Sequence, residues 1–334
     1  MRLTAKAAEV LGEREDVERF KALAEAIRVA LLDEYITPNG NLCIDTQTGY
    51  VLALYYGVYR DKEKLIQGFK RRLERDFFRI TCGFTGAPLM LPVLLDNGLK
   101  DVAYRMLLTE EFPGWLYAVN LGATTIWERW NSLEADGTIS GTGMNSLNHY
   151  AYGSVCEAVY SRIIGLQNAA PGWKRAVITP RIDARLHHAS IEYDSPAGLW
   201  RVAWRIEKDG SATLTATVPE GATAHVVLPD HPEGFEADVG AGEHEWRWMP
   251  AVDWLHSFSS ESRMMDLLDN ADAAAILRER VPALFYACQG RNNELRVKRP
   301  MEVANVMPLD RDAIWELDAP LRAVSFGYSG PTME

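Results

Sequence analysis

The spacing of apolar residues changes from a helical to a strand period near Trp173, and this change divides the 334-residue chain. Before it, apolar residues recur every three or four positions, which places residues such as Phe20, Leu23, Ile27 and Leu31 on one face of a helix. After it, short alternating or β-branched runs are separated by Gly- and Pro-containing turns. A helical part followed by an all-β part is therefore predicted.

The helical part is predicted to consist of hairpins, beginning with two helices joined at Gly12 by a short charged turn. Further helices are expected at 48–59, 61–78, 89–97, 100–108 and 150–164, with Asp61 capping the start of the second of these. The loops 81–87 and 134–144 are long and rich in Gly and Thr. Binding residues tend to lie on such loops.

The runs 176–179, 199–206, 213–218 and 225–228 are the clearest predicted strands, and about seven strands in this region predict a β-sandwich. From about residue 259 the helical period returns, at Met264, Leu267 and Leu268 and again over 273–284. We therefore expect a helical domain at 1–172, a β-sandwich at 173–250 and a mostly helical appendage at 251–334. The appendage carries no recognisable chemical motif.

The charge balance excludes several classes of partner. The 46 acidic against 35 basic residues give a net charge of −11 without a basic cluster, which argues against nucleic acid or an anionic membrane and is compatible with an uncharged substrate. The longest apolar uncharged stretch, 80–95, is broken by Gly and Pro and is too short to span a bilayer. The first residues lack the apolar core of a secretory signal, so we expect a cytoplasmic protein or the inner part of a longer one.

The four cysteines, Cys43, Cys82, Cys156 and Cys288, lie far apart, and none forms a C-x-x-C pair. This pattern predicts buried small hydrophobes in preference to a disulfide framework or a metal site. No metal is expected.

The most unusual local composition is the run 122–130, followed by 145–153. Trp127 and Trp130 bracket Glu128, and His149 follows in the second run. Tryptophan faces stack on the C–H faces of sugars, and a carboxylate beside them is partly removed from water, as in a glycosidase subsite. In the alternative interpretation, both tryptophans belong to the core, Glu128 and Arg129 are a surface pair, and His149 is a packed or capping residue.

Four blocks in this order resemble the C-terminal half of bacterial α-L-rhamnosidases, and the similarity extends over about residues 1–250. The blocks are TCGFTGAP at 81–88, FPGWLY at 112–117, TTIWERW at 124–130 and NSLNHYAYGS at 145–154. The resemblance implies an (α/α)6 toroid of helical hairpins followed by an all-β domain. It also implies that terminal α-L-rhamnose is released from rhamnosides with inversion, without a metal or an organic cofactor.

The resemblance also implies roles for individual residues. Glu128 takes the place of the general base and His149 that of a residue contacting the sugar. Because tryptophan faces stack on sugars, Trp127 and Trp130 are expected to belong to the substrate-binding surface. Inversion requires a second carboxyl group, about 6.5–9.5 Å from the first, that leaves room for the attacking water. Glu128 is one of the two.

The chain departs from the family at the general acid. The family carries this acid in an upstream run of the type D-C-P-x-R-D-E-R, and the present sequence contains no such run. The helices before residue 165 are also about half of those in a full toroid. We therefore expect a truncated or split form, completed by an upstream polypeptide, whose uncovered apolar helix faces favour self-association.

Two further interpretations remain open. An internal carboxyl, of which Asp45, Glu110 and Glu134 are candidates, takes the role of the acid. Alternatively, the chain is a non-catalytic carbohydrate-binding or interaction protein. A second carboxylate within reach of Glu128 distinguishes an enzyme from such a remnant.

Overall fold

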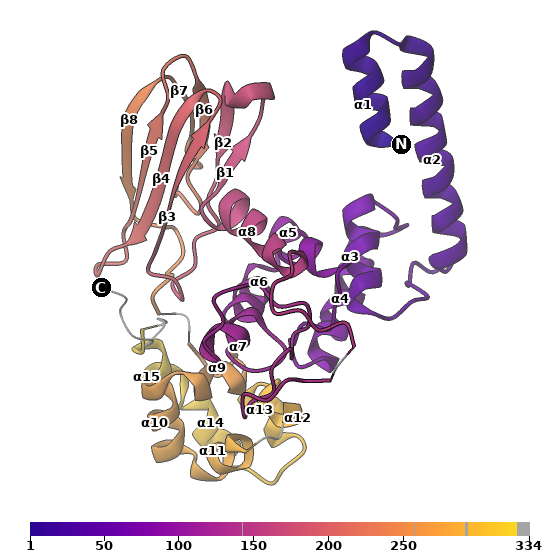
Figure 1. Ribbon diagram of the computed structural model, residues 1–334. Helices are drawn as coiled ribbons and strands as arrows, with labels where there is room; N and C mark the ends of the chain where they lie inside the picture. The colour runs from indigo at the N-terminus through magenta and orange to yellow at the C-terminus, as the bar shows by residue number, and fades with distance from the viewer. Residues whose placement is uncertain (142, 257, 291–292, 326–334) are drawn as a thin grey trace. The chain divides into compact units, whose positions relative to one another are not determined.

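The computed structural model describes residues 1–141, 143–256, 258–290 and 293–325. It divides into two compact units, Met1–Val155 and Cys156–Glu334. The first unit is helical, and the second contains the β-sheets and a helical tail (Figure 1).

Consecutive helices of the first unit pair as three hairpins within its described residues (Figure 1). The pairs are α1 (Arg2–Leu11) with α2 (Arg14–Tyr35), α3 (Gln47–Tyr56) with α4 (Lys62–Arg75), and α5 (Ala87–Asp96) with α6 (Lys100–Leu107). The short helix α7 (Trp115–Asn120), which the apolar spacing did not predict, follows them. The expected helical hairpins are thus confirmed.

The ends of these helices follow from local chemistry. Gly12 ends α1 with a left-handed backbone (φ 78°), a conformation that costs glycine little. Asp61 caps α4, as expected, because its carboxylate accepts the backbone N–H of Lys64 at 3.0 Å. Thr46 caps α3 in the same way by accepting the N–H of Gly49.

The prediction of a single helix at 150–164 is wrong in detail. The segment consists of a 3-10 turn, η1 (Ala151–Ser154), one turn of α-helix, α8 (Val155–Ala158), and a π-helical turn, η2 (Val159–Ile163). The hydroxyl of Ser154 donates to the carbonyl of Ala151, a side-chain bond that competes with regular helix hydrogen bonding. The β-branched residues Val155 and Val159 also crowd the preceding turn.

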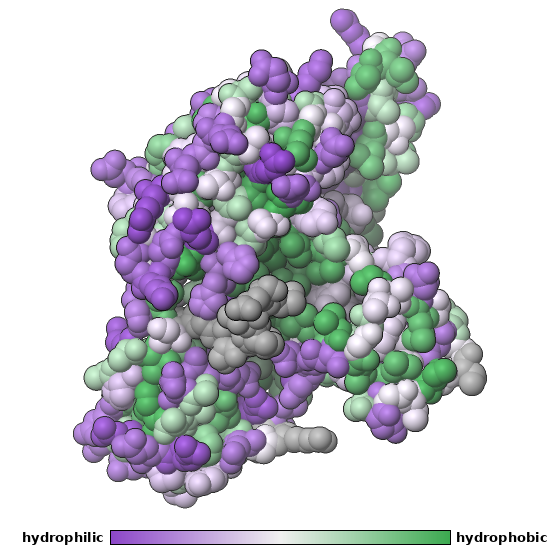
Figure 2. All heavy atoms as spheres, turned by 60° about the vertical axis from the view of Figure 1, so that its left-hand side comes forward, coloured by the Kyte–Doolittle hydropathy of each residue, from purple (hydrophilic) through white to green (hydrophobic). Residues whose placement is uncertain are grey.

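The apolar face predicted for α2 lies along one side of this helix and is exposed to solvent. Leu23, Ile27 and Leu31 are exposed, while the contact between α1 and α2 buries only the small residues Ala5, Ala8 and Val17. Apolar residues also reach the surface elsewhere, as the green atoms on the face drawn in Figure 2 show.

The second unit contains two four-stranded sheets in its described part, with strand orders β1-β2-β6-β7 and β3-β4-β5-β8. The strands are β1 (Leu166–Asn168), β2 (Arg175–Ile178), β3 (His188–Ser195), β4 (Gly198–Ile206), β5 (Ala212–Val218), β6 (Thr223–Val227), β7 (Glu236–Val239) and β8 (Gly242–Trp248). Among the described strands, only β2 and β6 run parallel. One face of β4 and β5 is buried and includes Trp200, Trp204 and Leu214, which confirms the expected sandwich.

The four runs predicted most clearly correspond to β2, β4, β5 and β6. Strand β1 pairs with β2 across the boundary proposed at 172/173. Three residues are too few to show an alternating pattern, so the sequence gives no sign of this strand. The domain limits 1–172, 173–250 and 251–334 stay predictions.

Helices return in the tail, as expected. Its described helices are α9 (Met264–Asp269), α10 (Ala271–Arg280), α11 (Pro282–Gln289), α12 (Asn293–Arg296), α13 (Pro300–Ala304), α14 (Arg311–Trp315) and α15 (Asp318–Arg322). They enclose an apolar cluster of their own that includes Met264, Leu277 and Leu321. None of the helices described in the chain is both long and apolar enough to cross a membrane.

The cysteines follow the expectation only in part. Cys82 and Cys288 are buried, and burial raises the pKa of each thiol to about 11. Cys43 and Cys156 are exposed, so the prediction of buried thiols is wrong for these two.

Candidate active site

Backbone hydrogen bonds bring the two chemistry-bearing runs together. The N–H of Glu128 donates to the carbonyl of Ser146 at 2.9 Å, and the N–H of His149 donates to that of Ile126 at 2.7 Å. The hydroxyl of Thr125 adds a bond to the carbonyl of Leu147. Segments 126–128 and 146–149 therefore lie side by side, which holds Glu128 and His149 in one local structure.

The carboxylate of Glu128 is half-buried and fixed on one side only. Its Oε2 accepts the backbone N–H of Ser146 at 2.8 Å. Within the described residues, Oε1 has no protein partner. A carboxylate held by one oxygen keeps the lone pairs of the other available to a water molecule or a sugar hydroxyl.

The ring of His149 is held in one orientation. Its Nδ1 accepts the N–H of Ala151 at 3.2 Å, which places the proton of the neutral ring on Nε2. The ring stacks on Phe84 and Tyr150, with centroids 4.8 and 5.1 Å apart and planes inclined by 17° in both pairs. His149 thus offers one N–H donor, Nε2, to a ligand.

Trp130 belongs to an aromatic cluster. Its ring stacks on Tyr152 at a centroid distance of 3.8 Å and meets Trp115 edge-to-face at 5.2 Å. Its indole N–H donates to the carbonyl of Cys82 at 3.0 Å, and that of Trp115 donates to the carbonyl of Tyr152 at 3.0 Å. The cluster fixes the plane of the partly exposed Trp130 ring.

Trp127 differs from Trp130 in its surroundings. Only 5% of Trp127 is exposed, whereas Trp130 keeps part of its surface open. The burial of Trp127 fits the core alternative for this residue, and its contact with substrate stays a prediction.

The three internal candidates for a general acid have other surroundings. Asp45 forms an ion pair with Arg75 at 2.7 Å. Glu134 accepts the side-chain amide of Asn131 at 3.2 Å, and Glu110 is exposed between α6 and α7. None of these contacts assigns any of the three to the role of acid.

The prediction from single residues missed several contributors to this region. Phe84 supports the ring of His149, Tyr152 and Trp115 support Trp130, and the backbone of Ser146 holds Glu128. All four lie inside the sequence blocks quoted for the resemblance. The blocks were the available signal, but a block does not reveal which residue contacts which.

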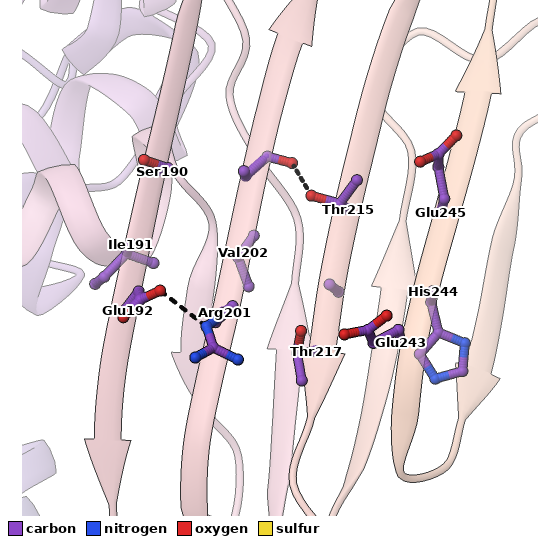
Figure 3. Close-up of a pocket in the computed structure, with 12 residues that line it drawn as sticks. Ser190, Ile191, Glu192, Arg201, Val202, Thr215, Thr217, Glu243, His244 and Glu245 are labelled. Carbon is purple, nitrogen blue, oxygen red and sulfur yellow. Dashed lines mark hydrogen bonds and ion pairs between the residues drawn. The ribbon is translucent and has the colours of Figure 1, made fainter.

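An open groove on the second unit contains none of the predicted site residues. It lies on the polar face of β3, β4, β5 and β8, where Glu192 pairs with Arg201 at 2.8 Å (Figure 3). No aromatic ring other than the imidazole of His244 lines it. Among the described residues, no group of His, Cys, Asp and Glu side chains is arranged to hold a metal ion.

Comparisons with known proteins cover both the helical and the β part. Residues 1–163 match the model of the bacterial alpha-L-rhamnosidase six-hairpin glycosidase domain, and residues 165–243 match that of the bacterial alpha-L-rhamnosidase C-terminal domain. The chain belongs to the bacterial α-L-rhamnosidase family. Its helical hairpins are accordingly part of a six-hairpin glycosidase domain.

Individual α-L-rhamnosidases are similar over about three quarters of the chain. The alpha-L-rhamnosidase of Alteromonas sp. (strain LOR) is 36% identical over 252 residues, which are 74% of this chain and 27% of that protein. The alpha-L-rhamnosidase of Streptomyces avermitilis is 37% identical over 241 residues, 71% of this chain and 23% of that protein. The chain thus spans about a quarter of the length of the curated relatives it matches.

Solved α-L-rhamnosidase structures share the fold. The enzyme from Aspergillus terreus superposes with a TM-score of 0.70 and 32% identity, covering 73% of this chain and 28% of its own. The Streptomyces avermitilis enzyme, solved in complex with L-rhamnose, gives a TM-score of 0.66 and 33% identity, covering 73% of this chain and 25% of its own.

Proposed function

We propose that the chain supplies the general-base side of an inverting α-L-rhamnosidase site, with Glu128 as the base. The observation that carries the proposal is the half-buried Glu128 carboxylate, with Oε2 held by the Ser146 amide and Oε1 open. In the reaction, Glu128 removes a proton from water as that water attacks the anomeric carbon. The substrate is a rhamnose-containing carbohydrate or glycoside.

The neighbouring side chains hold the sugar. His149 donates from Nε2 to a hydroxyl of rhamnose, since its Nδ1 is already engaged. Trp130, together with Trp127 three residues before it in the chain, provides the apolar surface for the C–H face of the ring. Family membership supports these roles, and a carboxyl at the position of Glu128 is what an inverting mechanism requires.

The general acid comes from a polypeptide segment outside these 334 residues. The acidic, Arg-rich run that carries it in the family is absent from the sequence, and Asp45 and Glu134 are engaged in other contacts. Without the acid, the departing oxygen leaves as an alkoxide or aryloxide, which raises the barrier for ordinary glycosides. We propose that an upstream polypeptide completes both the toroid and the pair of carboxyls. A cytoplasmic location stays a prediction.

The test is Glu128→Gln in the chain assembled with such an upstream polypeptide, using an aryl α-L-rhamnoside as substrate. We expect the rate to fall about a hundredfold or more, the usual contribution of general-base catalysis, because the amide keeps the shape but not the basicity. Glu9→Gln, the same chemical change on the exposed side of α1, is the matched control and should leave the rate unchanged. Near-normal turnover by the Glu128 variant would refute the assignment.

The second candidate is a non-catalytic carbohydrate-binding protein. It is favoured by the aromatic cluster around Trp130 and because no carboxyl among the described residues is assigned as the general acid that would act with Glu128. It predicts that the chain binds L-rhamnose but that no upstream polypeptide gives turnover. Measuring L-rhamnose binding and turnover on the same preparations separates the two candidates.

A further inference from the structure

One buried glutamine, Gln47, links the start of α3 to the loop that supports the candidate site. Gln47 is the first residue of α3 and only 1% of it is exposed. Its Nε2 donates to Oδ2 of Asp76 at 2.8 Å and to the carbonyl of Arg79 at 2.7 Å. Its Oε1 accepts the backbone N–H of Thr81 at 3.0 Å and is 3.9 Å from the thiol sulfur of Cys82.

The side chain of Gln47 therefore uses its full hydrogen-bonding capacity. An amide has two N–H donors and one oxygen with two lone pairs, and all of these face protein groups. Three of the four partners belong to the segment 79–82. A buried polar group this completely matched fixes its partners in position, since any displacement leaves a buried donor or acceptor unpaired.

The segment that Gln47 holds has little regular structure of its own. Directly after α4, Phe77 and Phe78 adopt left-handed backbone angles (φ 54° and 55°), which large side chains adopt only when their surroundings enforce them. Asp76 adds bonds from Nε of Arg72 at 2.9 Å and from the hydroxyl of Thr81 at 3.3 Å. Gln47 thus binds the backbone of Arg79 and Thr81, while the carboxylate of Asp76 binds the side chains around them.

Close packing adds a second restraint on the same loop. A Cβ atom placed on Gly86 would lie 2.7 Å from both the sulfur of Cys82 and the hydroxyl of Thr48. Thr48 follows Gln47 in the first turn of α3. The loop thus packs against the first turn of α3.

This loop contacts both site segments. The carbonyl of Cys82 accepts the indole N–H of Trp130 at 3.0 Å, and the ring of Phe84 stacks on His149 at 4.8 Å. A shift of the loop would therefore move the plane of Trp130 and the ring of His149 together. Small displacements of positioned groups have large effects on binding and catalysis.

We propose that Gln47 is a positioning residue of the rhamnose site, acting through the loop 81–88 on Trp130 and His149. The proposal rests on the proposed function for its sugar-binding consequence, but the coupling between Gln47 and the loops is independent of that function. Gln47 contacts no substrate in this scheme.

The experiment compares three variants of the full chain. Gln47→Glu keeps size and acceptors but loses both donated bonds and places a carboxylate against Asp76. Phe84→Leu leaves the Gln47 network intact and removes the ring that contacts His149 and Tyr152. Gln67→Glu, the same change as the first at an exposed position of α4, is the matched control.

Two readouts separate the inference from the proposed function. Amide hydrogen exchange over 81–88 and 126–130, measured where thermal unfolding shows the variant folded, should be about tenfold faster in Gln47→Glu than in the wild type and unchanged in Gln67→Glu. L-Rhamnose affinity by calorimetry should fall about tenfold in Gln47→Glu and in Phe84→Leu.

Each outcome decides a separate point. If the wild-type chain binds no L-rhamnose, the proposed function fails, while hydrogen exchange still tests the coupling. Exchange at 126–130 that is unchanged in a folded Gln47→Glu variant would overturn the inference, as would an unchanged L-rhamnose affinity in both variants. If Gln47→Glu does not fold, unchanged affinity in Phe84→Leu alone overturns the link from the loop to His149.

Discussion

Large apolar side chains are buried in the β-sandwich but exposed to solvent in the α1–α2 hairpin. In the sandwich, Trp200 and Trp204 on β4 are essentially inaccessible to solvent. In the hairpin, Leu3, Val10 and Leu11 are 80, 87 and 75% exposed. The sandwich therefore closes a core with its own residues, whereas the hairpin presents apolar side chains that need another surface to cover them.

The predicted site residues lie in the unit that contains this exposed hairpin. Glu128, His149 and Trp130 belong to the helical unit, whose described residues form three hairpins and match a six-hairpin glycosidase domain. The groove on the sandwich, by contrast, is lined by residues such as Glu192 and Arg201 that already neutralise each other. We therefore expect an additional polypeptide to affect the helical unit rather than the sandwich.

The largest effect is expected on adding that polypeptide. With an aryl α-L-rhamnoside, the rate should rise about a thousandfold when an upstream fragment carrying the acidic run is supplied, since general acid catalysis contributes about 10²–10⁴-fold. The measurement is turnover by the chain alone, by the fragment alone and by the mixture.

A fragment in which the acidic run is replaced by amides is the control for this prediction, because it can complete the toroid without supplying the acid. Full activity of the chain alone would contradict the comparison. It would assign the acid to an internal carboxyl such as Asp45, Glu110 or Glu134.

The next effect concerns the closed part. Trp204→Ala should lower the free energy of unfolding of the β-sandwich by about 3–5 kcal/mol, because it leaves a large cavity. Leu23→Ala, on the exposed face of α2, should change stability by less than about 0.5 kcal/mol. Denaturant titrations of each variant measure the difference, and equal losses would show that the α2 face is covered in solution.

A pair of conservative changes sharpens this test. The indole N–H of Trp204 donates to the carbonyl of Ile163 at 2.9 Å, whereas that of Trp200 has no hydrogen-bond partner among the described residues. Trp204→Phe should therefore cost about 1 kcal/mol more than Trp200→Phe, the usual net contribution of one hydrogen bond. The reverse order would show that packing outweighs this bond.

The sequence predicted the centre of each sheet better than its edges. The four runs predicted most clearly, β2, β4, β5 and β6, are the central strands of the two sheets, while β1, β3, β7 and β8 are edge strands. Central strands are buried and rich in apolar residues, whereas edge strands are short or carry charges that prevent aggregation. The edge strands here, such as β7 with Glu236 and Asp238, show this polarity.

The candidate site was predictable to the level of sequence blocks. The position of Glu128 between two tryptophans pointed to a carboxylate in an apolar setting, and the structure holds it as a half-buried group. The support from Gln47 could not be predicted, because its partners lie about 30 residues further along the chain and most are backbone atoms. Such bonds depend on the path of the loop rather than on a residue pattern.

The last effect is expected on association through the hairpin. The triple variant Leu3→Gln, Val10→Gln and Leu11→Gln preserves charge and helix propensity while removing the exposed apolar surface of α1. If the chain self-associates through this surface, the association constant from analytical ultracentrifugation should fall about tenfold, which corresponds to about 1.4 kcal/mol. Glu9→Gln, on the same helix, should leave association unchanged. An upstream fragment that binds the wild-type hairpin should also bind the triple variant more weakly, because both contacts use the same side chains. Unchanged association of the triple variant would mean that copies of the chain meet elsewhere and that the exposed face of α1 does not drive assembly.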